Sequence, residues 1–155
     1  MGYAERVLQP GETIAYRARL HWILMAPGTS LTLIAAVLAV AGLIAAPSGS
    51  RIGLWALSSV LLLIGATMLL RAWLRRLSTE IIVTNRRIIL KTGLISRRSI
   101  EMNLDKIESV MVNQPIIGRL LDYGTLIIRG VGSGLEPITN VAAPLEFHRH
   151  VNASA

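Results

Sequence analysis

Two long stretches without a charged residue constrain this chain more than any other feature of its sequence. Residues 22–50 carry no charge, and a second uncharged run covers residues 52–70. A helix needs about 20 apolar residues to cross about 30 Å of hydrocarbon. The segments Ile23–Ala46 and Ile52–Leu74 both reach that length. Neither has a charge near its centre, which would cost about 2.5–3.5 kcal/mol. We therefore predict two transmembrane helices.

The alternative to two spans is a pair of buried core helices. Both segments are apolar on all sides, and the remainder of the chain is too small to cover them. A turn is expected at Pro47–Ser50, so the spans would form a tight helical hairpin.

Basic residues predict the orientation of this hairpin. Arginines precede the first span and follow the second, whereas the turn contains only Arg51. The positive-inside rule then places both termini in the cytoplasm, as expected for a multi-pass protein of the cell inner membrane. Side chains suited to anchoring the span ends at the membrane surface are Trp22, Trp55, Trp73, Arg71, Arg75 and Arg76.

Composition narrows the function classes. Apolar residues make up 52% of the 155 residues and charged residues 16%, which excludes intrinsic disorder. The chain has no cysteine, so a disulfide scaffold, a Cys-ligated zinc site and thiol catalysis are excluded. The net charge of +7 favours anionic partners. Because much of the basic excess flanks the spans, we expect phospholipid rather than nucleic acid.

The pattern changes to short strands after Ser78. β-Branched and apolar segments alternate with turn residues and predict a small antiparallel sandwich or partly open barrel. The expected strands are Thr79–Thr84, Arg87–Lys91, Leu94–Met102, Ile107–Asn113, Leu126–Arg129 and Glu136–Val141. We expect a helical turn at Pro115–Asp122 and a flexible connection at Gly130–Gly134. A short closing helix should begin at Pro144, with Leu145 and Phe147 facing inward.

These elements predict a membrane α + β fold with four parts. They are a cytoplasmic lead-in (residues 1–21), the two-span hairpin (22–74), a cytoplasmic strand domain (78–151) and a tail (152–155). The lead-in would either lie on the membrane surface or pack on the sheet.

Several stretches carry a resemblance to a known family. They are Ile82–Ile88, Lys91–Arg97, Asn103–Val110 and, most specifically, Gln114–Thr125, together with Leu8–Glu12 and Tyr16–Trp22 in the lead-in. The chain resembles the bacterial pleckstrin-homology-like domain proteins, also called membrane-flanked domain proteins, over residues 78–151. The resemblance implies a strongly bent β-sandwich closed at one end by a C-terminal helix. It implies no established chemistry.

The densest basic cluster is the first candidate site. It consists of Arg86, Arg87, Lys91, Arg97 and Arg98, and it would bind anionic lipid or a partner. Each such residue near an anionic surface contributes about 1 kcal/mol. The alternative is a solvated strand face whose arginines and lysine pair across strands with Glu80, Glu101 or Glu108.

The second candidate is an apolar docking turn. Ile116, Ile117, Leu120 and Leu121 surround Gly118-Arg119. They would dock on lipid or on a partner, or else pack into the sandwich.

No pattern of residues predicts catalysis, a cofactor or a metal. His148 and His150 stand two apart, a spacing that points helical side chains away from each other. The glycines of Gly130–Gly134 lack the Lys-Ser/Thr ending of a phosphate-binding loop. We therefore expect a non-catalytic interaction or scaffold protein, an accessory subunit of a membrane complex or a homo-oligomer. The alternative is a protein that binds anionic lipid headgroups.

Overall fold

The protein is described by a computed structural model covering residues 8–44, 47–93, 98–131, 133–134 and 137–154. It divides into two compact units. One contains Met1–His21 and Arg75–Ala155, and the other is Trp22–Leu74.

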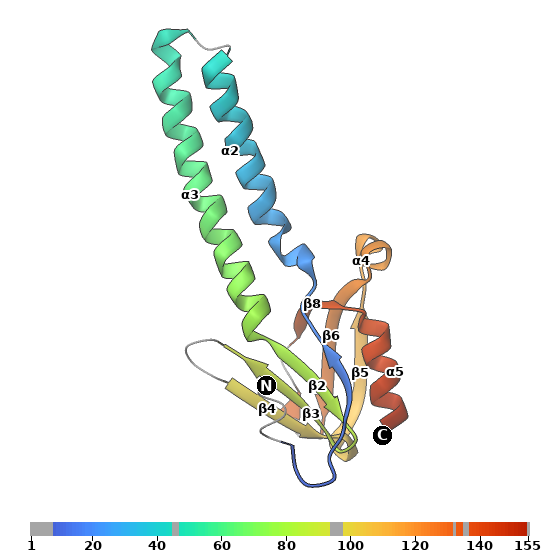
Figure 1. Cartoon of the computed structure of the whole chain (residues 1–155). Coiled ribbons are helices and arrows are strands. Elements are labelled where there is room, and N and C mark those ends of the chain that lie inside the picture. Colours follow the sequence, from blue (N-terminus) through green and yellow to red (C-terminus); the bar gives the residue numbers. More distant parts are fainter. Residues whose placement is uncertain (1–7, 45–46, 94–97, 132, 135–136, 155) are drawn as a thin grey trace. The chain divides into compact units, whose positions relative to one another are not determined.

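The smaller unit is a helical hairpin (Figure 1). A 3-10 turn η1 (Trp22–Met25) leads into α2 (Ala26–Ile44), and α3 runs from Ser48 to Ser78. Ser48–Ser50 therefore belong to the helix and not to the predicted turn. The cause is local, because the backbone N–H groups of Ser50 and Arg51 both donate to the carbonyl of Pro47.

Small residues let α2 and α3 approach closely. The buried positions are seven apart, at Gly28, Ala35 and Gly42 on α2 and at Ser58 and Gly65 on α3. A Cβ added at Gly65 would lie 2.6 Å from Thr32 Oγ1 and 3.1 Å from the Thr32 backbone nitrogen. The helices thus pack backbone against backbone, as small residues allow in helix pairs.

The outward faces of both helices are apolar. Large aliphatic side chains such as Leu33 (67% exposed) and Leu63 (65% exposed) cover them. Trp22–Ile44 and Gly49–Ser78 have 23 and 30 residues, and each contains an 18-residue stretch with a mean hydropathy of 2.1. By length and composition, both are able to cross a membrane.

The larger unit contains two antiparallel sheets (Figure 1). The first has the order β1 (Ile14–Ala18), β2 (Glu80–Thr84), β3 (Arg87–Thr92), β4 (Arg98–Asn103). In the second, β6 (Tyr123–Gly130) pairs with β5 (Ile107–Asn113), β7 (Ser133–Gly134) and β8 (Ile138–Ala142). The short helices are η2 (Leu104–Lys106), α4 (Ile116–Leu121) and α5 (Pro144–Ser154).

Each predicted strand overlaps an observed one, with three differences. Strand β1 lies in the lead-in, where no strand was predicted. Strand β6 begins at Tyr123, three residues before the predicted start, and the predicted flexible connection contains the two-residue strand β7. Residues 94–97 of the predicted Leu94–Met102 strand and residue 136 of the predicted Glu136–Val141 strand lie outside the described residues.

The lead-in packs on the sheets. Strand β1 pairs with β2, and beyond it Leu20 bridges to Val141 of β8. His21 donates its backbone N–H to the carbonyl of Asn140 (2.7 Å). One segment therefore joins both sheets, which closes the sandwich along this edge.

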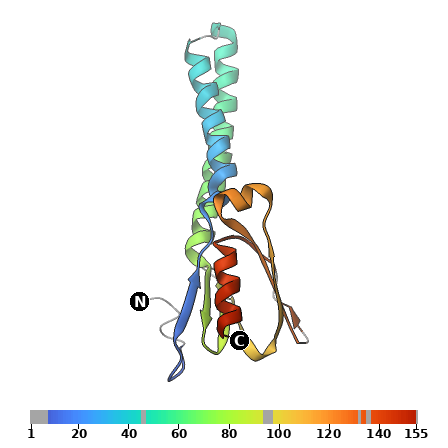
Figure 2. The same ribbon diagram turned by 90° about the vertical axis from the view of Figure 1, so that its right-hand side faces the viewer.

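Helix α5 covers the opening between the sheets and contacts β1, β2, β5 and β6 (Figure 2). Phe147 and Val151 are buried, four residues apart, whereas Leu145 is 54% exposed. The prediction was right for Phe147 and wrong for Leu145, because a residue two positions before Phe147 lies on the other side of a helix. The helix continues to Ser154, so residues 152–154 are helical and not a tail.

Candidate functional site

A buried carboxylate in the lead-in binds the most central arginine of the predicted basic cluster. Glu12 follows the turn Gln9-Pro10-Gly11, in which Gly11 has a φ of 80° that suits glycine. Arg87 donates from Nε and Nη2 to the two carboxylate oxygens of Glu12, at 2.9 and 2.8 Å. Thr84 Oγ1 donates to the same carboxylate at 2.7 Å. Arg87 Nη1 also donates to Glu101 at 2.7 Å.

The electrostatics of this network follow from its geometry. The hydrogen bond from Arg87 is the main cause that lowers the pKa of Glu12 from 4.5 to about 2, against burial, which raises it. The hydrogen bond with Glu12 raises the pKa of Arg87. Arg87 therefore holds the lead-in to the first sheet. Its pair with Glu101 on the neighbouring strand is one of the cross-strand pairs that the sequence offered as the alternative to anion binding.

Of the remaining cluster residues that the structure describes, Arg86 lies apart from Lys91 and Arg98. Arg86 stands in the β2–β3 turn, whereas Lys91 lies near the other end of β3, about 13 Å along a strand that rises about 3.3 Å per residue. Lys91 is opposite Glu80 on β2, and Arg98 is opposite Thr92. Arg97 lies outside the described residues. Successive hairpin turns alternate between the two ends of a sheet, and this separates residues that are close in sequence.

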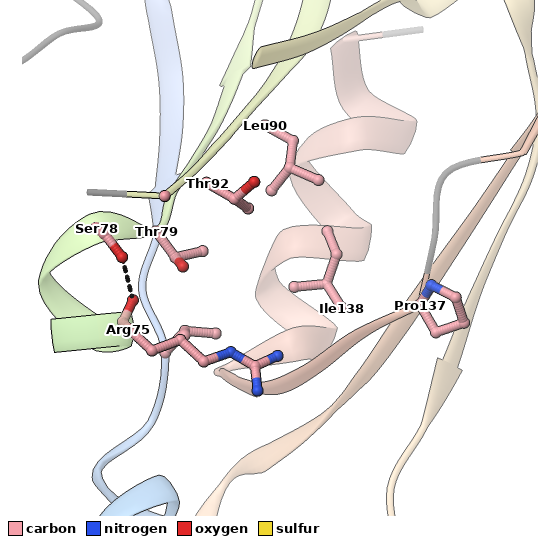
Figure 3. Close-up of a pocket in the computed structure, with 9 residues that line it drawn as sticks. Arg75, Ser78, Thr79, Leu90, Thr92, Pro137 and Ile138 are labelled. Atoms are coloured by element: carbon pink, nitrogen blue, oxygen red, sulfur yellow. Dashed lines mark hydrogen bonds between the residues drawn. The ribbon is translucent and has the colours of Figure 1, made fainter. Parts of the chain in front are cut away.

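A cavity of about 290 Å³ lies near the end of α3 (Figure 3). Leu20, Leu90 and Ile138 supply apolar walls. The polar lining comes from Arg75, Ser78, Thr79 and Thr92, and the Ser78 hydroxyl donates to the carbonyl of Arg75. A guanidinium beside hydroxyl groups in a largely apolar cavity suits a small anionic group attached to an apolar body. The sequence did not predict this cavity, and it indicated only a membrane-anchoring role for Arg75.

The predicted docking turn is helix α4, and it does not pack into the sandwich. Ile116, Ile117 and Leu120 are 88%, 60% and 83% exposed. Leu121 is half-buried. Helix α4 lies between β5 and β6 at the tip of their hairpin (Figure 2). Its three exposed side chains form an apolar surface there.

The predicted anchor residues are exposed. Trp22, Trp55 and Trp73 are 52%, 47% and 50% exposed, and the ring of Trp55 lies against Gly42. Arg71 is exposed on α3. Arg76 is also exposed and donates from Nε to the carbonyl of Leu20 at 3.1 Å.

The histidines stand in different surroundings. His21 stacks on Tyr123 and His150 on Tyr16, with ring centroids 5.3 and 4.6 Å apart. Burial is the main cause that lowers the pKa of His21, followed by the charge of Arg76. Across the described part of the chain, no three His, Cys, Asp or Glu side chains gather as a metal site would require.

Comparison with protein families identifies a match over most of the chain. A family model described as a bacterial PH domain covers residues 22–155, so it includes both apolar helices as well as the strands. No curated protein and no solved structure matches the chain significantly.

Proposed function

This chain belongs to the bacterial PH domain family, and from that premise we propose that it is a membrane-anchored interaction protein without catalytic activity. Membership confirms the family resemblance of the sequence and supports an interaction or lipid-binding module. The helical hairpin would hold the strand domain at the cytoplasmic face of the inner membrane. There it would act as an accessory subunit of a membrane complex or assemble with its own copies.

The observation that carries the proposal is the exposed apolar surface of α2 and α3. The candidate spans Trp22–Ile44 and Gly49–Ser78, of 23 and 30 residues, expose large aliphatic side chains along their length. Contiguous apolar surface of this extent is unfavourable in water and favourable in lipid. The arginines at the span ends support the cytoplasmic orientation of the termini.

The first experiment tests the membrane anchor. Membranes containing the full chain are washed with alkaline carbonate, and sealed cells are treated with external protease. We expect the chain to stay in the pellet and its C-terminal half to be protected. Release by carbonate, or digestion from outside, would refute the anchor or its orientation.

The second experiment tests the interaction role. The full chain is crosslinked in native membranes and purified in mild detergent. We expect another membrane protein, or further copies of the chain, to be recovered with it in fixed proportion. Recovery only as a monomer under several mild conditions contradicts the interaction role and leaves the anchor intact.

A second candidate function is binding of an anionic lipid headgroup, and the cavity beside Arg75 favours it. Arg75 and the hydroxyls of Thr79 and Thr92 line that cavity, whereas Arg87 of the original cluster is engaged by Glu12 and Glu101. The test compares retention of spin-labelled phosphatidylglycerol by the reconstituted chain and by Arg75→Gln, with Arg86→Gln as the control. Equal retention by all three would exclude this site.

A further inference from the structure

Helix α4 exposes an apolar surface that is too small for a protein interface of its own. It has six residues, and its exposed aliphatic side chains are Ile116, Ile117 and Leu120. A stable protein interface buries about 800 Å² on each partner, from about 20–30 residues. Insertion into lipid needs no such reciprocal area, because each apolar side chain gains separately from leaving water.

The C-terminal end of α4 is fixed to the point where the chain enters the first apolar helix. The His21 ring is hydrogen-bonded to the backbone of Leu121, the last residue of α4. The same ring stacks on Tyr123, which opens β6, with centroids 5.3 Å apart. His21 is bonded directly to Trp22, where the first candidate span begins.

The second apolar helix ends at the same place in the strand domain. Arg76, near the C-terminus of α3, donates from Nε to the carbonyl of Leu20 at 3.1 Å. Both connections to the helical hairpin and the base of α4 therefore lie at one end of this domain. A six-residue helix is about 9 Å long at 1.5 Å per residue, so no part of α4 is far from the entry point of the first span.

We propose that α4 is a membrane-surface anchor whose Ile116, Ile117 and Leu120 side chains insert into the lipid interface. This inference rests on the proposed membrane anchoring of α2 and α3. Amphipathic helices that lie on a membrane bury their apolar face about 5–10 Å into the boundary between headgroups and acyl chains, and the three side chains of α4 would enter the same boundary. Exposed Arg119, between the aliphatic residues, would bind lipid phosphate. Together with the two spans, α4 would give the domain a third attachment point and fix its orientation on the bilayer.

The absence of cysteine from the chain makes a site-specific test direct. Three single-cysteine variants, Ile117→Cys, Val131→Cys and Leu62→Cys, are labelled with an environment-sensitive nitrobenzoxadiazole dye. Each full-length variant is placed as one copy in nanodiscs of phosphatidylcholine and phosphatidylglycerol. Doxyl-labelled lipids then report which dyes contact lipid.

The control position, Val131, is about as exposed as Ile117 but lies at the other end of β6. Ile117 is 60% exposed and Val131 66% exposed, so neither cysteine removes core packing. Val131 follows β6 at the end remote from Tyr123, about 26 Å away over eight residues at about 3.3 Å each. Leu62 lies within α3 and reports on the span itself.

The expected result is a blue shift and quenching by doxyl lipid at Ile117 and Leu62, with neither change at Val131. Lipid contact at Leu62 but water at Ile117 would overturn the α4 inference and leave the membrane anchor standing. Water at Leu62 would refute the anchor and the inference together. A blue shift at Ile117 that doxyl lipid does not quench would assign the surface to a protein contact and overturn the inference.

Discussion

Replacing Glu12 with glutamine should remove a substantial part of the stability of the strand domain. The Glu12 side chain is fully buried, and the Arg87 side chain is 12% exposed. A pKa lowered from 4.5 to about 2 corresponds to about 3 kcal/mol in favour of the charged carboxylate in the folded state, at about 1.4 kcal/mol per pKa unit. Glu12→Gln keeps the shape and loses the charge, so we expect a loss of about 3 kcal/mol, at the low end of the roughly 3–5 kcal/mol of a broken buried ion pair.

The assay is urea denaturation of the full chain in nanodiscs, with pulse proteolysis reporting the unfolded fraction. The control is Glu146→Gln, because Glu146 is 53% exposed and lies 3.9 Å from Arg149. An exposed pair of this kind contributes about 0–1 kcal/mol. If the two variants unfold at the same urea concentration, the Glu12–Arg87 pair does not hold the lead-in to the sheet.

The stability difference between wild type and Glu12→Gln should change with pH in a defined direction. Because folding lowers the pKa of Glu12, its contribution is complete above about pH 4.5 and is lost as the pH falls towards about 2. The difference in stability between wild type and Glu12→Gln should therefore shrink across this window. A difference that stays constant, or grows, on acidification would refute the assignment of the lowered pKa.

Two further pairs of substitutions test packing. Gly65→Ala should lower the thermal midpoint of the helical hairpin in micelles, followed by circular dichroism, because the new Cβ would lie 2.6 Å from Thr32 Oγ1. The control is Gly53→Ala, whose new Cβ would have no atom within 4 Å. It should keep or raise the midpoint, because Ala favours a helix over Gly by about 1 kcal/mol. Equal shifts of the midpoint in the two variants would contradict close packing at Gly65. Phe147→Ala should cost about 3–5 kcal/mol in the urea assay, as for a buried aromatic residue, and exposed Leu145→Ala under about 1 kcal/mol. The reverse order would mean that α5 presents its other face to the sheets.

Patterns local to the chain determined most of the element types. The absence of charge identified α2 and α3, and β-branched runs identified every strand except β1 and β7 to within a few residues. Pro144 marked the first residue of α5. Hydropathy patterns, backbone propensities and proline geometry depend on a few neighbouring residues. A single sequence is therefore enough to predict the type of each element from them.

Only the tertiary structure decided which side chains meet. Glu12 binds Arg87 across 75 positions, and the only local sign was the Gln-Pro-Gly-Glu turn. The alternation of hairpin ends separated Arg86 from Lys91. Apolar Ile116 and Leu120 were compatible with burial or exposure, and the position of α4 at a hairpin tip left them exposed. Periodicity tells which residues share a face of an element; what covers that face depends on contacts between segments distant along the chain.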